Sequence, residues 1–128
     1  MKGIILLNRQ VYTEDAKGEI KLLHDTGNLM HVAKEQQIEV VKLNSDYLNI
    51  YYTIPFALHF DLKKFNKTFD YLLIYSASHF EDFRRDYDEY WKAIRSHFTF
   101  VIEAEQHLQQ EISLSSSEIQ DLPPISNL

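Results

Sequence analysis

Ser76, Ser78 and His79 are the residues of this chain that come nearest to a catalytic grouping. A histidine beside a serine can act as the base that activates the hydroxyl as a nucleophile. The Gly-x-Ser-x-Gly turn that presents such a serine in α/β hydrolases is absent. Ser78 also has a structural explanation, because with Glu81 it forms the capping box of a following helix. We therefore predict no catalytic residue here, although His79 stays of interest because it follows a predicted strand.

The residues that usually bind metals or phosphates do not form a recognisable site. None of the six histidines belongs to the i, i+4 pair with a glutamate that marks a zinc helix. The absence of cysteine excludes disulfides, thiol catalysis and cysteine-ligated metals. With only three glycines, a phosphate-cradling loop is not expected. We predict no cofactor-binding and no metal-binding residue. The histidines are His24, His31, His59, His79, His97 and His107.

Strand and helix patterns alternate along the chain. Apolar runs predict strands at residues 3–7, 38–43, 69–76 and 98–102. The periodicity of the intervening segments predicts helices. The first of these helices either tolerates Gly27 or begins at Asp25 or Thr26, and ends near Gln36 and Gln37. The others are expected at residues 55–67, where Pro55 fits the first turn, at residues 78–95, and as a short helix over 103–111.

Three segments leave alternatives open. Residues 11–23 form either a hairpin or a loop followed by a helix. Residues 47–53 form a short strand or an ordered loop. In residues 56–62 the apolar side chains also alternate with strand period, but we favour a helix because lysines gather at its carboxyl end.

The helix predicted over residues 78–95 has the clearest two-sided pattern. We expect its apolar stripe to face the core, and it consists of Phe80, Phe83, Tyr87, Tyr90, Trp91 and Ile94. Its acidic residues lie among arginines and predict a solvated, salt-bridged face. They are Asp82, Asp86, Asp88 and Glu89, with Arg84 and Arg85 between them.

The alternation of strands and helices predicts an α/β fold. We expect a three-layer architecture, with a mainly parallel sheet of four to five strands and helices on both faces. A chain of 128 residues fits one domain. We place this domain at residues 1–112, and predict a poorly ordered tail rich in serine and containing proline at residues 113–128.

Composition limits the partners. The net charge is −6 and the pI is about 5.4. Nucleic-acid binding depends on neutralising phosphates, so DNA is expected to bind weakly at best. No apolar run reaches the length of a membrane span, and the first residues lack the pattern of a signal peptide. We therefore expect a cytoplasmic protein with no membrane partner.

Several segments resemble the catalytic domain of the serine recombinases, the resolvase and invertase family. Val11-Tyr12-Thr13-Glu14-Asp15 is similar to the family's arginine-valine-serine-threonine loop after the first strand. Pro55 stands where an arginine-proline pair opens a helix. The resemblance covers residues 3 to 105, and implies a resolvase-like domain of flavodoxin-like topology. Its other segments are Val32-Ala33-Lys34-Glu35-Gln36-Gln37-Ile38-Glu39-Val40-Val41, Phe69-Asp70-Tyr71-Leu72-Leu73-Ile74-Tyr75-Ser76 and Phe98-Thr99-Phe100-Val101-Ile102.

The same comparison implies that the family's chemistry is lost. The family attacks a DNA phosphodiester with a serine, and arginines neutralise the phosphate. Tyr12 stands at the place of that serine. The arginine positions hold Gln10, with Arg9 one residue away, then Ile54, His79 and Asp82. The family continues into a long dimerisation helix and a DNA-binding segment, so we expect that this chain, which ends at Leu128, does not grip a recombination site in the same way.

We therefore predict a non-catalytic domain, not an enzyme, that binds a protein partner or itself. Exposed aromatic residues such as Tyr47, Tyr51 and Tyr52 are the expected contact surface. One alternative is a DNA-associated accessory protein with a weak DNA contact. Another is a flavodoxin-like protein that binds a small molecule beyond Leu7, Leu43 and Ser76. Whether Arg9, Tyr12 and His79 line a usable cleft is left open by the sequence.

Overall fold

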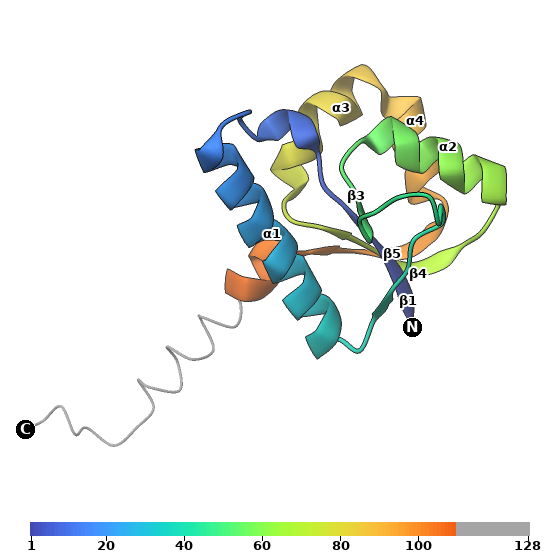
Figure 1. Ribbon diagram of the computed structural model, residues 1–128. Coiled ribbons are helices and arrows are strands. Elements are labelled where there is room, and N and C mark those ends of the chain that lie inside the picture. The colour runs from blue at the N-terminus through green and yellow to red at the C-terminus, as the bar shows by residue number, and fades with distance from the viewer. Residues whose placement is uncertain (110–128) are drawn as a thin grey trace, which may run out of the picture.

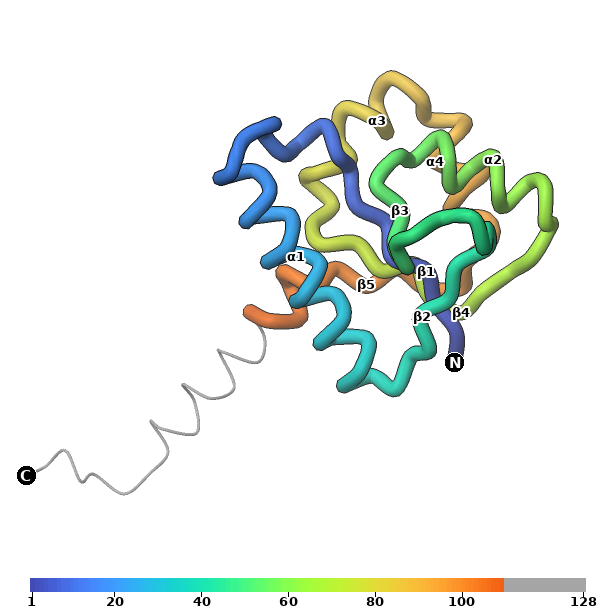
Figure 2. Tube along the Cα trace, in the orientation of Figure 1, coloured from blue at the N-terminus to red at the C-terminus, as the bar shows by residue number. Residues whose placement is uncertain are grey.

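Five parallel strands form the sheet in residues 1–109, the part of the chain that the computed structural model describes. The strand order is β2-β1-β4-β5, and β3 pairs with the same edge of β1 as β2 but further along (Figures 1 and 2). The strands are β1 (Lys2–Leu6), β2 (Glu39–Val40), β3 (Tyr51–Tyr52), β4 (Phe69–Ile74) and β5 (Phe98–Glu103).

Helices cover both faces of the sheet, as the sequence predicts (Figure 1). One face is packed by α1 (Ala16–Glu35), together with residues 104–109, which are also helical. The other is packed by α2 (Pro55–Phe65), α3 (Glu81–Asp86) and α4 (Asp88–Arg95). Two short 3₁₀ turns, η1 (Arg9–Val11) and η2 (Ala77–Phe80), follow β1 and β4. The predicted three-layer α/β fold is confirmed.

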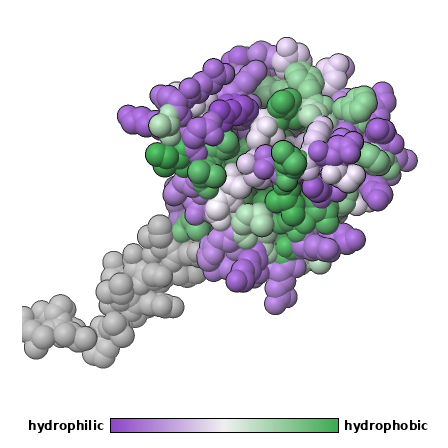
Figure 3. Space-filling model, viewed as in Figure 1, coloured by the Kyte–Doolittle hydropathy of each residue, from purple (hydrophilic) through white to green (hydrophobic). Residues whose placement is uncertain are grey.

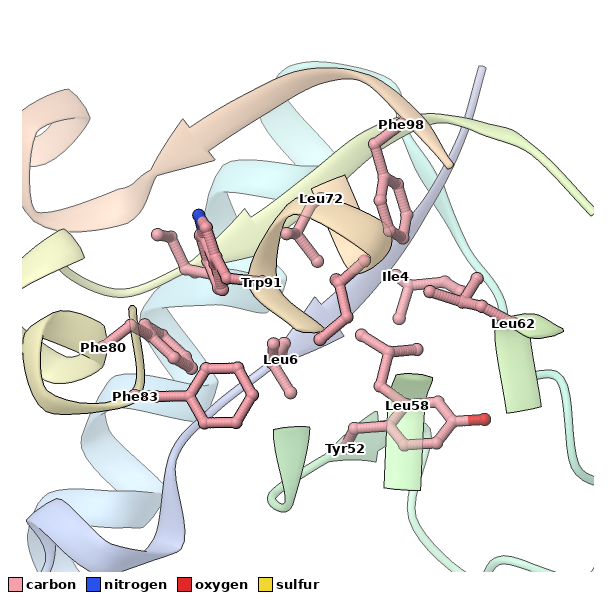
Figure 4. Close-up of a cluster of buried hydrophobic side chains, with 12 residues drawn as sticks. Ile4, Leu6, Tyr52, Leu58, Leu62, Leu72, Phe80, Phe83, Trp91 and Phe98 are labelled. Atoms are coloured by element: carbon pink, nitrogen blue, oxygen red, sulfur yellow. The ribbon is translucent and has the colours of Figure 1, made fainter. Parts of the chain in front are cut away.

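The core explains why the two central strands are continuously apolar. Side chains of β1 and β4 alternate between the two faces, and both faces are covered, so residues 3–6 and 72–74 are all buried. On the face shown in Figure 4, Leu6 and Leu72 meet Leu58 from α2 and Trp91 from α4. The register Ile5↔Leu73 places the partner residues side by side on the opposite face, under α1.

The structure decides between the alternatives for α1. The helix begins at Ala16, so a loop followed by a helix is confirmed for residues 11–23 and the hairpin is wrong. The helix tolerates Gly27, so a start at Asp25 or Thr26 is wrong, and Gly18 also lies inside the helix. Asp15 is the N-cap, and its carboxylate accepts a hydrogen bond from the backbone N–H of Gly18 at 2.9 Å. A Cβ on Gly18 would stand 1.7 Å from the backbone oxygen of Thr13, so glycine is required there for close packing.

The segment predicted as one helix over residues 78–95 is three pieces. Ser78 does not cap it, because Ser76 caps η2 by accepting a hydrogen bond from the N–H of Ser78. The chain then breaks at Tyr87, where φ is −133°, between α3 and α4. Because of this break, α4 is rotated about its axis relative to a straight continuation of α3. As a result Tyr87 and Tyr90 are 46% and 43% exposed, and the prediction that they face the core is wrong.

The remaining predictions are confirmed in outline. The segment from Pro55 is a helix with proline in its first turn, and residues 51–52 form a short strand. The strand predicted at residues 38–43 is shorter, with two residues in the ladder. The predicted domain boundary at residue 112 and the tail at residues 113–128 lie outside the described residues.

Candidate functional site at the carboxyl ends of the strands

A cavity of about 530 Å³ opens at the carboxyl ends of β1, β3 and β4. Its walls come from the loop after β1, the entry to α2, and the segment that runs from η2 through α3. The chain leaves β1 toward β2 on one side, whereas β4 lies on the other side of β1. This is the topological switch point of an open parallel sheet, the place where such folds bind ligands.

Asn8 fixes two of the loops that form this cavity. Its side-chain Nδ2 donates to the backbone oxygen of His79 at 3.0 Å, and its Oδ1 accepts from the N–H of Gln10 at 3.2 Å. Asn8 is itself buried. It therefore ties the turn after β1 to the turn after β4, and holds the cavity walls at a set spacing.

The serines that suggested a nucleophile serve the backbone instead. The Ser76 and Ser78 hydroxyl oxygens lie 2.8 Å apart, and Ser76 also caps η2. The ring of His79 makes its aromatic contacts with Tyr75, stacked at 5.7 Å, and with the edge of Tyr12 at 5.8 Å. The two hydroxyls are therefore joined by local hydrogen bonding.

Tyr12 lies beneath the cavity, in the layer under α1, and is not among the cavity-lining residues. Its hydroxyl donates to Oδ2 of the fully buried Asp25 at 2.6 Å. Burial, reinforced by the carboxylate of Asp25, raises the pKa of the Tyr12 phenol far above its ordinary value. A phenol acts as a nucleophile through its phenolate, so this environment suppresses nucleophilic attack.

His79 does line the cavity. Burial lowers the pKa of its imidazole, and the attraction of Asp25 offsets only part of that effect. The ring is therefore neutral near pH 7. A neutral imidazole cannot replace the fixed positive charge that an arginine supplies.

Arg9 is the cation among the lining residues, and it is already paired. Its guanidinium binds the Glu19 carboxylate, and its backbone N–H donates to the oxygen of Thr53 at 2.8 Å. The lining also contains three carboxylates, from Glu81, Asp82 and Asp86. Arg85 pairs with Asp82 at 3.3 Å and with Asp86 at 3.0 Å. The cavity consequently has no surplus of positive charge.

The other wall of the cavity is aromatic, and the sequence analysis missed it. Phe56 sits edge-on to three rings: Phe83 at 5.1 Å, Tyr87 at 4.9 Å and Tyr90 at 5.2 Å. Phe56 is 40% exposed, and Phe60, one turn further along α2, is 64% exposed. We call Phe56, Phe60, Tyr87 and Tyr90 the aromatic surface. Phe56 and Phe60 stand at i and i+4, off the face that buries Leu58 and Leu62, and this spacing is the signal in the sequence.

The tyrosines expected at the surface are elsewhere. Tyr52 is 3% exposed and donates its hydroxyl to the buried Asp61 at 2.7 Å, so its predicted role in an exposed contact surface is wrong. Tyr47 packs edge-on against Tyr52 at 5.4 Å, and Tyr47 and Tyr51 are half-buried. These three tyrosines contribute to packing around β3.

Within residues 1–109 the structure contains no group of three or more histidine, aspartate or glutamate side chains arranged to hold a metal ion. No helix in that part of the chain is both long and apolar enough to cross a bilayer. Comparisons with models of protein families, with curated proteins and with solved structures gave no match to this chain.

Proposed function

We propose that this chain is a recombinase-like domain that has lost strand transfer and works as a protein-binding module. The proposal rests on one observation above others: the aromatic surface is exposed, and two of its members, Phe56 and Tyr87, line the switch-point cavity. Residues that the resemblance aligns with catalytic arginines also meet at this cavity, namely Gln10, Ile54, His79 and Asp82. Their grouping supports a common architecture, and their chemistry supports the loss of catalysis.

The loss of catalysis follows from charge. Phosphoryl transfer needs a nucleophile and fixed cations around a highly charged transition state. Here the phenol of Tyr12 is buried against a carboxylate, and the guanidinium of Arg9 is paired with Glu19. Ile54 is apolar, and Asp82 would repel a phosphate. The groups at the positions of the family's serine and arginines are therefore not suited to attack or to stabilise a phosphodiester.

The partner is a protein segment with an apolar anchor side chain and basic neighbours. Exposed rings at the edge of a cavity supply large contact area at low entropic cost, and such rings dominate the binding energy of many interfaces. The carboxylates of Glu81, Asp82 and Asp86 favour a nearby lysine or arginine over a phosphate backbone. A nucleic acid is disfavoured for the same reason.

A random peptide library displayed on phage tests this binding chemistry directly. Selection on the wild-type protein should enrich peptides that combine an aromatic or aliphatic anchor with lysine or arginine. Phe56→Glu should abolish their binding, because it places a carboxylate among the rings of Phe83, Tyr87 and Tyr90. Leu48→Glu is the matched control, since Leu48 is 99% exposed and lies away from the cavity-lining residues. Equal binding by the two variants, or no enrichment, would contradict the proposal.

The loss of strand transfer has its own test. The purified protein is incubated with supercoiled plasmid and with linear duplex DNA at low and moderate salt. We expect no nicked product, no covalent protein–DNA adduct and no salt-sensitive mobility shift. Nicking or an adduct would show that the site is active, and salt-sensitive binding alone would restore the role of a DNA accessory protein.

The cavity volume favours one other function. A volume of about 530 Å³ falls in the range of small-molecule sites, and the switch point is where flavodoxin-like folds bind FMN. Thermal-shift titration with FMN and with AMP distinguishes this function from peptide binding. Saturable stabilisation by either ligand that Asn8→Ala removes would favour a small-molecule site.

A further inference from the structure

A second cavity opens at the end of the sheet opposite the switch-point cavity. Its volume is also about 530 Å³, and the two cavities share no lining residue. It lies beside Lys2 and Phe69, the first residues of β1 and β4. The chain that follows β2 and the turn between α2 and β4 complete its walls. We call it the lysine cavity, after Lys2, Lys42 and Lys67 in its lining.

The lining of the lysine cavity is cationic. Three of its eight residues are lysines, and none is acidic. Lys2 points to the same face of the sheet as Ile4 and Leu6, because side chains alternate along a strand. The ammonium of Lys42 donates to the backbone oxygen of Tyr47 at 2.6 Å, which holds it in place and leaves it further N–H donors. Within residues 1–109 none of the three lysines forms an ion pair with a carboxylate.

Two carboxylates stand near these lysines without lining the cavity. Asp70 accepts a hydrogen bond from the backbone N–H of Lys2 at 2.8 Å, and Glu39 is the ladder partner of Lys2. Lys63 and Lys64, in the last turn of α2, offset the negative end of the dipole of that helix. The lining therefore attracts anions, although the net charge of the whole chain is −6.

The rest of the lining supplies hydrogen-bond donors and an apolar wall. The side chains of Asn66 and Thr68 make no hydrogen bond within the part of the chain that the structure describes. Val41, Leu43 and Phe69 are half-buried and pack against the core. Apolar side chains bordered by hydrophilic ones are visible below α2 in Figure 3. The volume of the cavity lies in the range of small-molecule sites.

We propose that the lysine cavity binds the phosphate groups of a small organic diphosphate. Lysine binds phosphate oxygens as a point charge, and three ammonium groups match the roughly three negative charges of a diphosphate near pH 7. Asn66 and Thr68 donate further hydrogen bonds to the phosphate oxygens, and the apolar wall contacts the organic group. A carboxylate or a single phosphate leaves part of the positive charge unmatched.

Isothermal titration calorimetry with pyrophosphate and with ADP tests this site. In about 0.1 M salt, exposed charges further apart than about 10 Å are screened, which suppresses diffuse attraction. Both probes should bind saturably, and ADP more tightly, because its nucleoside meets the apolar wall. Lys42→Gln and Lys67→Gln should each weaken binding roughly tenfold. Lys63→Gln is the matched control, because it makes the same change in net charge outside the lining, and all three lysines are exposed.

Amide NMR spectra locate the bound probe. The signals of Lys42, Lys67 and Thr68 should shift on addition of ADP, and those of Asn8 and His79 in the switch-point cavity should not. Shifts confined to Asn8 and His79 would place the diphosphate in the other cavity and overturn the proposal. Peptide binding by the aromatic surface does not depend on this result, because the lysine cavity lies at the opposite end of the sheet.

Three outcomes of the titrations would also overturn the proposal. Neither probe may bind saturably, or Lys63→Gln may weaken binding as much as Lys67→Gln does, which would mean diffuse attraction by the lysines of this region. Duplex DNA that binds more tightly than ADP through the same lysines would assign the cavity to a nucleic acid instead of a small molecule.

Discussion

Replacing Tyr12 by phenylalanine should destabilise the fold, because it removes a buried donor and nothing else. The Tyr12 hydroxyl donates to Oδ2 of Asp25 at 2.6 Å, and Asp25 is fully buried beneath α1. The other carboxylate oxygen lies 3.1 Å from Nδ1 of His24. After Tyr12→Phe, the Asp25 carboxylate keeps its contact with His24 but loses the hydrogen bond from the phenol.

The expected loss can be estimated from this geometry. A hydrogen bond to a charged group contributes about 1.5–3 kcal/mol, and the cost rises when the remaining partner stays buried. For a chain of this length each kcal/mol corresponds to a fall of roughly 4 °C in Tm. We therefore expect Tyr12→Phe to lower Tm by roughly 6–12 °C. The ring itself stays packed against His79, so the lost packing is small.

A double-mutant cycle in urea measures the interaction. Tyr12→Phe, Asp25→Asn and the double variant are compared with wild type, and a coupling free energy of about 1 kcal/mol or more is expected. Tyr90→Phe is the matched control, because Tyr90 is 43% exposed, and its change should stay within about 0.5 kcal/mol. A coupling energy near zero would show that the hydroxyl and the carboxylate do not support each other, and would refute the reasoning.

Three further predictions concern single residues. Gly18→Ala should lower the free energy of unfolding by several kcal/mol, because its Cβ would stand 1.7 Å from the backbone oxygen of Thr13. Gly27→Ala should raise the free energy of unfolding by about 1 kcal/mol, because its Cβ would meet nothing within 4 Å and alanine is the better helix former. Burial and a neighbouring carboxylate raise the pKa of both Tyr12 and Tyr52, so an absorbance titration should show two phenols that ionise only on unfolding, and stability should fall as the pH rises above about 10. The lowered pKa of His79 has the opposite effect on stability: the free energy of unfolding that is present above about pH 6.5 is lost as the pH falls below it. His79→Gln should reduce that loss, as measured by urea titrations above and below about pH 6.5. Phenols that titrate normally in the native protein, or a His79 variant with unchanged acid sensitivity, would contradict these two expectations.

The strands could be predicted because both faces of the sheet are covered, so the side chains that point to either face are apolar and the strand appears as a continuous apolar run. The runs at residues 3–7 and 69–76 are apolar whichever way each side chain points. The sequence leaves the start of α1 open for a local reason. Gly18 and Gly27 carry an intrinsic penalty in helices, yet the cap of Asp15 and the packing of Gly18 against Thr13 outweigh it.

The candidate site was predicted in part. The end of β4 and the resemblance both pointed to His79, and the structure places it on the cavity wall with Arg9. The two tyrosines of the aromatic surface could not be predicted from periodicity, because the break at Tyr87 rotates α4 relative to α3. A pattern that assumes one continuous helix assigns Tyr90 to the core.

The central position of β1 determines when the chain can fold during synthesis. The strand at Lys2–Leu6 leaves the ribosome before the other strands, but its ladder partner β4 is made only after residues 69–74 have been added, and β5 pairs with β4 in turn. Until then β1 can pair only with the two-residue strands β2 and β3, which leaves its other edge open. Such distant parallel pairings are slow to form and leave apolar surface open to aggregation. We therefore expect a nascent chain of this protein to keep apolar strand edges exposed until synthesis reaches β5.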